Sequence, residues 1–225
     1  MKTDKIVIAK ALSRVFLLGG QPVKAIDKVS LEVGTGEFLI LKGKSGSGKS
    51  TLLSLMGGLD RPSSGTLEVS GIDLSGLGPN QLARFRREHM GFVFQTFNLL
   101  PTLSVLENVA LPALLADTPA QDCFEKAWEL LRLAELEERA LHKPSEISGG
   151  EMQRTAIARA LINDPTLIIA DEPTGNLDSR TGSRILGFIK DLNRSMGRTV
   201  VMATHSSDAD AMAHRILRLH DGRFT

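Results

Sequence analysis

The chain has 225 residues, of which 42% are apolar and 24% are charged, and its net charge is +1. This composition is ordinary for a folded globular protein and gives no reason to expect attraction to nucleic acid or anionic lipid. The single cysteine, Cys123, excludes an intrachain disulfide. No run approaches the roughly 18–20 apolar residues of a membrane span, so a role at a membrane would need another chain to provide the span.

Short apolar segments typical of buried strands recur along the chain. They separate helical patterns, and this alternation predicts an α/β fold with a parallel core sheet. The segment 38–41 is a continuous apolar run, which fits a strand buried on both faces. The predicted strands are 5–9, 29–33, 38–41, 167–170 and 199–203.

The middle of the chain has no strand pattern between about residues 98 and 166. Residues 119–136 carry apolar side chains at helical spacing, and Pro119 suits the first helical position. We expect Trp128 to pack in a helical core rather than to serve as a ligand platform. We predict a single domain, 1–225, in which a helical subdomain of about 96–166 is inserted between α/β parts of about 1–95 and 167–225.

Residues 43–50, Gly-Lys-Ser-Gly-Ser-Gly-Lys-Ser, match the phosphate-loop pattern G-x-x-x-x-G-K-[ST]. The loop lies between an apolar strand and a predicted helix over 50–56, as the motif requires. Glycines let successive N–H groups point at phosphate oxygens, and the helix N-terminus adds its positive dipole end. Lys49 reaches the β- and γ-phosphates, and the Ser50 hydroxyl ligates Mg²⁺. The predicted ATP-binding residues are Gly43, Ser45, Gly46, Ser47, Gly48, Lys49, Ser50 and Thr51.

The strand 167–170 ends in two carboxylates, Asp171 and Glu172, and Pro173 stops the strand. In phosphate-loop enzymes an Asp at this place helps to hold Mg²⁺, and a carboxylate one residue later can polarise the attacking water. Alone, the pair would be interpreted as a solvated strand end. With the phosphate loop present, the catalytic interpretation is favoured.

Residues 147–154, Ile-Ser-Gly-Gly-Glu-Met-Gln-Arg, resemble the signature motif of ABC ATPases, usually written LSGGQ. Gln95 resembles the glutamine of the Q-loop, Asp178 the aspartate of the D-loop, and His205 the switch histidine. Phe16 stands where the family commonly has an aromatic ring that stacks on adenine. The resemblance covers essentially the whole chain. It implies a P-loop NTPase fold with an N-terminal antiparallel β-subdomain and an inserted helical subdomain.

The resemblance also implies a function, the ATP-hydrolysing subunit of an ABC transporter. Such subunits form a head-to-tail dimer on binding ATP, here expected to be a homodimer. Ser50, Gln95 and Asp171 would then serve Mg²⁺, Glu172 would position or deprotonate water, and His205 would stabilise the γ-phosphate end. The residues expected to complete the other subunit's ATP site are Ser148, Gly149, Gly150, Glu151 and Asp178.

Two departures from the family pattern matter. Glu151 replaces the usual glutamine, and its spacing from Ser148 is that of a capping box, so we expect it to point back at Ser148 and cap a helix. That helix N-terminus would offer free N–H groups to an anion. Phe16 replaces the commoner tyrosine, and stacking needs only the ring. A phenylalanine of the core is the alternative for Phe16.

Family members of this kind work with an integral membrane permease, at the cytoplasmic face of the cell membrane. The stretches 57–62, 92–101, 107–109 and 171–178 resemble a bacterial subgroup, the lipoprotein-releasing, macrolide-exporting and cell-division ATPases. A helix of the permease would enter an exposed groove. The apolar residues expected in that groove, with buried core as the alternative, are Phe97, Leu99, Leu100, Leu103 and Val105.

Two other functions compete with the transporter. Soluble ABC ATPases that act on ribosomes usually carry two ATPase units, and those that act on DNA separate the phosphate loop from the signature by a long coiled coil. Here there is one unit, and a gap of about 100 residues without sustained heptads. The neutral charge also argues against a nucleic-acid partner. A small-molecule kinase would share the phosphate loop but would have no use for the signature motif, Asp178 and His205.

Overall fold

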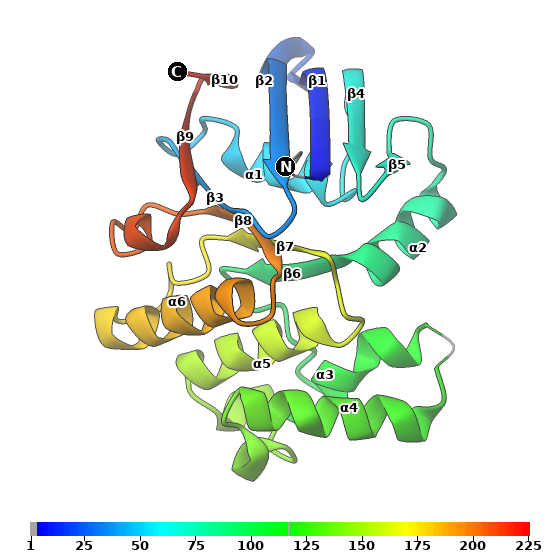
Figure 1. The fold of residues 1–225 in the computed structure, drawn as a ribbon, viewed down its shortest axis with the longest axis vertical. Helices are drawn as coiled ribbons and strands as arrows, with labels where there is room; N and C mark the ends of the chain where they lie inside the picture. The colour runs from blue at the N-terminus through cyan, green and yellow to red at the C-terminus, as the bar shows by residue number, and fades with distance from the viewer. Residues whose placement is uncertain (1–3, 117) are drawn as a thin grey trace.

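The computed structural model describes residues 4–116 and 118–225. An antiparallel sheet lies at one end, a larger sheet crosses the middle, and most helices gather at the other end (Figure 1). The strands are β1 (Lys5–Leu18), β2 (Gln21–Gly34), β3 (Phe38–Lys42), β4 (Ser64–Val69), β5 (Ile72–Asp73), β6 (Met90–Phe94), β7 (Leu167–Asp171), β8 (Thr199–Ala203), β9 (Arg215–His220) and β10 (Arg223–Phe224). The α-helices are α1 (Lys49–Met56), α2 (Pro79–His89), α3 (Val105–Leu114), α4 (Ala120–Leu133), α5 (Gly149–Leu161) and α6 (Ser179–Arg194).

The central sheet has the order β10-β9-β3-β8-β7-β6 and is parallel from β9 to β6, which confirms the predicted parallel core. Its apolar runs are buried on both faces. On β3, Leu39 and Leu41 pack toward the antiparallel sheet and α1, whereas Phe38 and Ile40 pack toward α5 and α6. The carboxyl ends of β3, β6, β7 and β8 meet at one edge, so the segments that follow them are brought together there.

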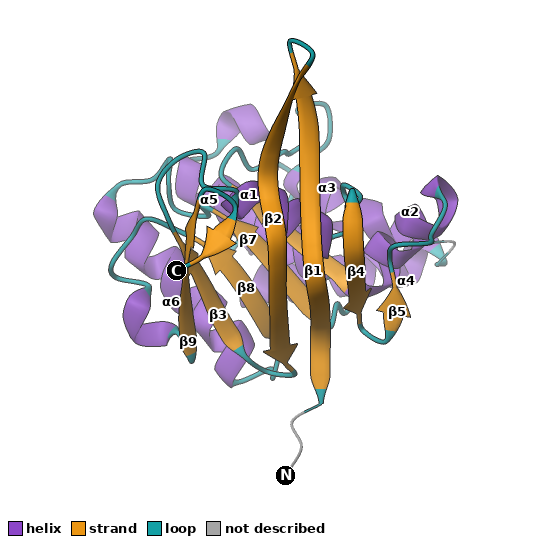
Figure 2. Cartoon of the chain, turned by 90° about the horizontal axis from the view of Figure 1, so that it is seen from above, coloured by secondary structure: helices purple, strands orange, loops and turns teal. Residues whose placement is uncertain are grey.

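The antiparallel sheet has the order β2-β1-β4-β5. Its first strand runs from Lys5 to Leu18, nearly three times the length of the predicted segment 5–9. The prediction stopped early because irregular pairing with β2 breaks the alternation near Ala11, where φ is 47°. The tip of the β1–β2 hairpin projects beyond the rest of the molecule (Figure 2).

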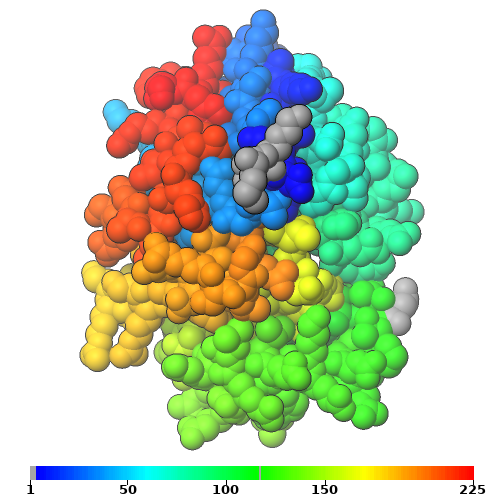
Figure 3. All heavy atoms as spheres, viewed as in Figure 1, coloured from blue at the N-terminus to red at the C-terminus, as the bar shows by residue number. Residues whose placement is uncertain are grey.

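Helices α3, α4 and α5 enclose a small apolar core of their own, and Figure 3 shows this part as the lower end of the molecule. Trp128 is half-buried and packs against that core. Helix α4 begins at Ala120 and ends at Leu133, so Pro119 precedes the helix instead of opening it. Helix α5 belongs to both layers, since Ile157 packs toward the central sheet and Ala158 toward α3 and α4.

Among the described residues, five strands were not predicted: β4, β5, β6, β9 and β10. Two of them have only two residues, and β9 alternates poorly, with a single fully buried side chain at Leu219. Such strands are defined by hydrogen bonds to distant segments rather than by their own pattern. Across residues 4–116 and 118–225, no helix is long and apolar enough to cross a membrane.

Candidate active site

The phosphate loop connects the end of β3 to α1, and its glycines are needed for space. At Gly48, where φ is 104°, a Cβ atom would lie 2.3 Å from the carbonyl oxygen of Ala25. At Gly43 a Cβ would lie 2.3 Å from the oxygen of Leu219. At Gly46, with φ of 78°, no atom lies within 4 Å of that position. The loop is therefore packed against the protein on one side and open on the other, where a phosphate would approach.

Lys49 is the first residue of α1 and is 6% exposed. Its ammonium donates to the carbonyl oxygens of Gly43 (2.8 Å) and Lys44 (3.1 Å), and its Nζ lies 3.5 Å from Nε2 of His205. The charge is thus held over the loop by neutral carbonyls. Oxygens of a phosphate could replace those carbonyls as partners at little cost in geometry.

A cavity of about 560 Å³ lies over this loop. It gathers the predicted residues from four separate segments, since Gln95 follows β6, Glu172 follows β7 and His205 follows β8. The described residues that line it are Ala25, Ser45, Gly46, Ser47, Gly48, Lys49, Ser50, Thr51, Gln95, Glu172, Gly175 and His205. Of the residues predicted to act within one subunit, the structure brings most together here, although Phe16, Gly43 and Asp171 are not among the lining residues.

Glu172 and His205 are in direct contact in the lining of the cavity. The backbone N–H of His205 donates to Oε2 of Glu172 (3.1 Å), and Nε2 of His205 lies 3.2 Å from Oε1 of Glu172, which becomes an ion pair when the imidazole is protonated. Glu172 has φ of 47°, a conformation that non-glycine residues rarely adopt and that is common at functional sites.

The donor set around Asp171 fits a hard divalent cation. Oδ1 of Asp171 is buried and has no hydrogen-bond partner among the described residues, so it presents an unsatisfied negative oxygen at the end of β7. Within residues 4–116 and 118–225, no group of three or more His, Cys, Asp or Glu side chains could hold a metal by itself. A Mg²⁺ ion would therefore take Asp171, Ser50 and Gln95 together with phosphate oxygens, which matches its preference for oxygen ligands.

Gln95 is tied to the segment after β7 by a reciprocal pair of hydrogen bonds. Its amide donates to Oδ1 of Asn176 (3.0 Å), and the Asn176 amide donates to the Gln95 carbonyl (3.0 Å). A Cβ atom at Gly175 would lie 2.8 Å from the Gln95 amide nitrogen, so the Gln95 side chain would have to shift to admit a larger residue there. This link between the Q-loop and the D-loop was not predicted, because an Asn–Gln pair 81 residues apart leaves no pattern in a sequence.

The signature residues form the N-terminus of α5, and they do not line the cavity of their own subunit. Ser148 is the N-cap, and its Oγ accepts from the N–H of Glu151. Glu151 Oε2 accepts from both the N–H and the hydroxyl of Ser148 (2.7 Å each), which confirms the predicted capping role. A Cβ at Gly150 would lie 2.5 Å from Cγ2 of Thr181, so α5 closely approaches the start of α6.

Glu151 carries a negative charge that the usual glutamine would lack. Burial raises the pKa of its carboxyl, but hydrogen bonds from Ser148 and Arg139 outweigh burial and lower the pKa to about 2. Nε of Arg139 lies 3.0 Å from Oε1 of Glu151. The extra charge is therefore compensated within the subunit, and Arg139 was not predicted because it lies 12 residues away in the sequence.

Asp178 and Phe16 lie outside the cavity. Asp178 is the N-cap of α6, and its Oδ1 accepts from the N–H groups of Arg180 and Thr181 (3.0 Å each). Phe16 is partly exposed on β1, and the Arg14 guanidinium lies 4.4 Å from the centroid of its ring. The ring is therefore not buried in the core, and its contact with adenine stays a prediction.

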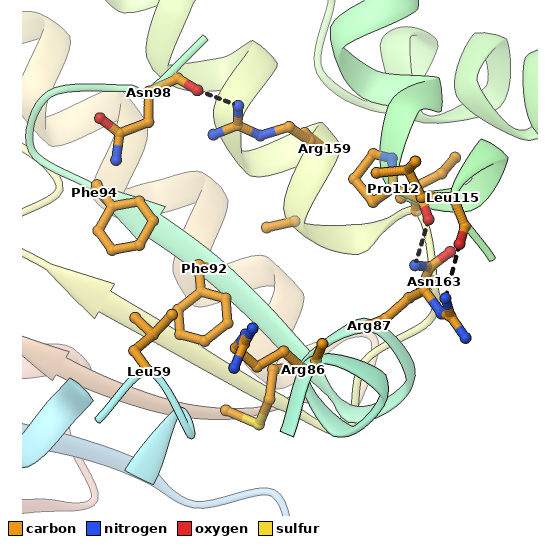
Figure 4. Close-up of a pocket in the computed structure, with 14 residues that line it drawn as sticks. Leu59, Arg86, Arg87, Phe92, Phe94, Asn98, Pro112, Leu115, Arg159 and Asn163 are labelled. Atoms are coloured by element: carbon orange, nitrogen blue, oxygen red, sulfur yellow. Dashed lines mark hydrogen bonds between the residues drawn. The ribbon is translucent and has the colours of Figure 1, made fainter. Parts of the chain in front are cut away.

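A second cavity, of about 510 Å³, lies between α2, β6 and the helical layer. Of the five residues predicted to line a groove, Val105 is fully buried in the helical core, which is the alternative that the sequence left open, and none of the other four lines this cavity. Its apolar lining includes Leu59, Phe92, Phe94, Pro112 and Leu115, and Arg86, Arg87 and Arg159 also line it (Figure 4). The run 97–103 instead forms the loop that Arg159 holds through the carbonyls of Phe97 and Asn98.

Comparison with known proteins decides the family. Residues 26–175 match the family model described as "ABC transporter". The chain belongs to the family of ABC transporter ATP-binding proteins. It therefore has the P-loop NTPase fold of an ABC cassette, binds ATP and is an ATPase.

Several relatives are similar over nearly the whole chain. An uncharacterized ABC transporter ATP-binding protein of Thermotoga maritima is 48% identical and aligns with 93% of this chain and 89% of its own length. The cassette MJ0796 of Methanocaldococcus jannaschii is 45% identical over 95% of this chain and 92% of its own. A solved dimeric structure of that cassette, bound to ADP and Pi, superposes with a TM-score of 0.90, at 42% identity and covering 97% and 96% of the two chains.

A third relative is longer. The macrolide export ATP-binding/permease protein MacB of Rhodospirillum rubrum is 48% identical over 94% of this chain but only 32% of its own length. This ABC cassette therefore spans about a third of that relative. The similarity matches the expected resemblance to the macrolide-exporting group.

Proposed function

We propose that this chain is the ATP-hydrolysing subunit of a transporter of the lipoprotein-releasing and macrolide-exporting type. It acts as a homodimer bound peripherally at the cytoplasmic face of the cell membrane, and it powers a separate membrane permease. The observation that carries the proposal is the cavity over the phosphate loop, which gathers Lys49, Gln95, Glu172 and His205, while the signature residues face elsewhere.

The chemistry is hydrolysis of ATP to ADP and phosphate. Lys49 and the loop N–H groups bind the phosphates, and Ser50, Gln95 and Asp171 would hold Mg²⁺, which supplies charge neutralisation at the β- and γ-phosphates. Glu172 accepts the proton of the attacking water. His205 donates to the γ-phosphate end and keeps Glu172 oriented through its backbone N–H. Positioning and charge stabilisation account for most of the rate enhancement in such reactions.

The dimer follows from the incomplete site. Ser148, Gly149 and Gly150 offer a helix N-terminus to an anion but lie away from their own subunit's cavity, so they are available to a second copy. ATP then becomes part of the interface, and its hydrolysis removes the binding energy that holds the two copies together. The solved dimer of the related cassette supports this arrangement.

Replacing Glu172 tests the chemistry. Glu172→Gln keeps the size and the hydrogen-bonding shape of the side chain but removes the base. We expect ATP binding to persist, turnover to fall nearly to zero, and a dimer to accumulate with ATP, as measured by gel filtration and phosphate release. Turnover close to that of the unmodified protein would remove Glu172 from the mechanism.

The cavity beside α2 is the proposed docking site for a short helix of the permease. Its apolar lining includes Leu115, which is 63% exposed, and three arginines also line it. Leu115→Glu should reduce recovery of the permease when the tagged ATPase is purified from detergent-solubilised membranes. Leu141→Glu is the matched control, since Leu141 is 79% exposed and does not line this cavity. If the tagged, unmodified ATPase is recovered with ribosomal or DNA-repair proteins instead of a permease, the transporter proposal is contradicted. The ATPase assignment would stand.

A further inference from the structure

Gln153 lies one turn into α5 and is fully buried. Its side-chain amide donates to the carbonyl oxygen of Pro173 at 2.7 Å and faces that of Phe94 at 3.4 Å. Pro173 and Phe94 belong to two different segments at the carboxyl edge of the central sheet. One buried amide of the signature helix therefore joins both segments.

Each of these carbonyls adjoins a residue of the proposed active site. Pro173 directly follows Glu172, whose φ of 47° is held by hydrogen bonds from its N–H to Ala203 (2.9 Å) and from Gly175 to its carbonyl (3.0 Å). A strained backbone of this kind persists only where its surroundings determine it strongly. The bond from Gln153 is a further restraint on the same turn.

Phe94 directly precedes Gln95, which is itself paired with Asn176. The Gln153 amide thus touches the two segments that carry the proposed water-positioning carboxylate and the proposed Mg²⁺ ligand. Its own helix carries Gly149 and Gly150, which would complete the partner's site. Movement of α5 would shift Glu172 and Gln95 through this amide.

Stability does not explain why an amide stands there. Oε1 of Gln153 is buried without a hydrogen-bond partner among the described residues, and an unsatisfied buried acceptor is costly. The unpartnered Oε1 therefore lowers the stability of the fold, although the amide nitrogen of the same side chain donates to Pro173. Compared with an apolar residue of similar length, Gln153 adds the two contacts of its amide with the carbonyl oxygens of Pro173 and Phe94.

We propose that Gln153 is a positioning residue for ATP hydrolysis, one that fixes the Glu172 turn and the Gln95 segment relative to the signature helix of the same subunit. The proposal rests on the proposed roles of Glu172 and Gln95. Through this residue, the α5 N-terminus bound at one ATP site sets the geometry of the catalytic groups at the other.

The test compares Gln153→Leu with Asn193→Leu. Asn193 is also a buried amide that donates twice to backbone carbonyls, those of Gly36 (2.9 Å) and Arg198 (2.7 Å), but it lies at the far end of α6. Both variants remove a similar donor pair, so both should lose thermal stability. Only Gln153→Leu should lower kcat, by about ten- to a hundredfold, because small misplacement of catalytic groups has effects of that size.

Three measurements separate the possible outcomes. Titration calorimetry should show ATP affinity within about twofold of the unmodified protein for both variants, so that the loss is in kcat alone. Equal kcat in the two variants would overturn the proposal. If Gln153→Leu fails to fold, Gln153→Met, which fills irregular space better, is measured against the same control. If Glu172→Gln abolishes turnover while the Gln153 variants keep theirs, the role of Gln153 is contradicted and the proposed mechanism stands. If Glu172→Gln stays active, the proposed mechanism itself is contradicted.

Discussion

The N-termini of α1 and α5 carry the phosphate loop and the signature motif, and the two helix ends are built differently. At α1 the N-cap is Gly48, which has no side chain to accept a hydrogen bond, and the end of the helix opens into the cavity over the phosphate loop. At α5 the N-cap is Ser148, and Glu151 completes a capping box on the surface. Helix ends leave several N–H groups without partners, and the two motifs satisfy them in different ways.

In the proposed dimer, this difference separates the two ends by role. The α1 end binds the phosphates within one subunit, whereas the α5 end supplies half of a site that another subunit completes. The α1 end needs an anion, since no side chain caps its first turn. The α5 end is already capped in the single chain, and only the leading N–H groups, those of Gly149 and Gly150, are free of an intrahelical acceptor. We therefore expect changes at α1 to affect ATP binding by one subunit, whereas changes at α5 should leave that binding unchanged and affect turnover in the closed dimer.

The largest effect should follow removal of the charge at α1. Lys49→Ala should weaken ATP binding at least about a hundredfold, because charge-assisted hydrogen bonds to phosphate are lost. Lys44→Ala is the control, since the Lys44 side chain is exposed in the same loop and only its carbonyl contacts Lys49. Unchanged affinity of the Lys49 variant in titration calorimetry would contradict the phosphate-loop assignment.

At α5, Ser148→Ala should leave ATP affinity of the single subunit unchanged but lower turnover about tenfold, since a poorly ordered helix end stabilises the partner's phosphate less well. It should also cost about 1 kcal/mol of stability. Ser104→Ala provides a matched control, because Ser104 and Glu107 form the same capping box on α3. That variant should lose a similar stability and keep its turnover; equal turnover in the two variants would argue against the half-site.

A smaller effect is expected from the charge pair beside α5. Arg139→Leu leaves Glu151 uncompensated near the proposed phosphate position, and turnover should fall about threefold, the size expected of a partly exposed ion pair. Adding Glu151→Gln should restore turnover, because the charge that needed compensation is gone. Steady-state kinetics of the two single variants and the double variant measures the coupling, and additive losses would mean that Arg139 acts in another way.

The smallest expected effect is on stability at acidic pH. Because the pKa of Glu151 is lowered to about 2 in the folded chain, its contribution is fully present above the unfolded pKa and is lost as pH falls toward 2. Urea unfolding should show that this group contributes about 1 kcal/mol less at about pH 4 than at about pH 6. Glu151→Gln should lack that component. Parallel pH profiles for the two proteins would show that the carboxyl is not held in this way.

Prediction from sequence succeeded where a local pattern carries the information. The run Phe38–Leu41 predicted a strand buried on both faces, and β3 is one. The spacing of Ser148 and Glu151 predicted a capped helix start, and α5 begins there. It failed where several distant segments decide the outcome. The cavity beside α2 was not predicted, because its apolar lining residues Leu59, Phe92, Phe94, Pro112 and Leu115 come from distant segments that share no motif.

The sequence by itself determined the phosphate loop, the carboxylate pair, the signature helix start and the parallel core, because each depends on neighbouring residues with a fixed period or a required backbone conformation. The tertiary structure alone decided which groups meet: Gln95 with Asn176, Arg139 with Glu151, and Gln153 with the Pro173 and Phe94 carbonyls. These contacts join residues 12 to 81 positions apart. Their partners are selected by how the layers pack, and a single sequence does not record that packing as a pattern.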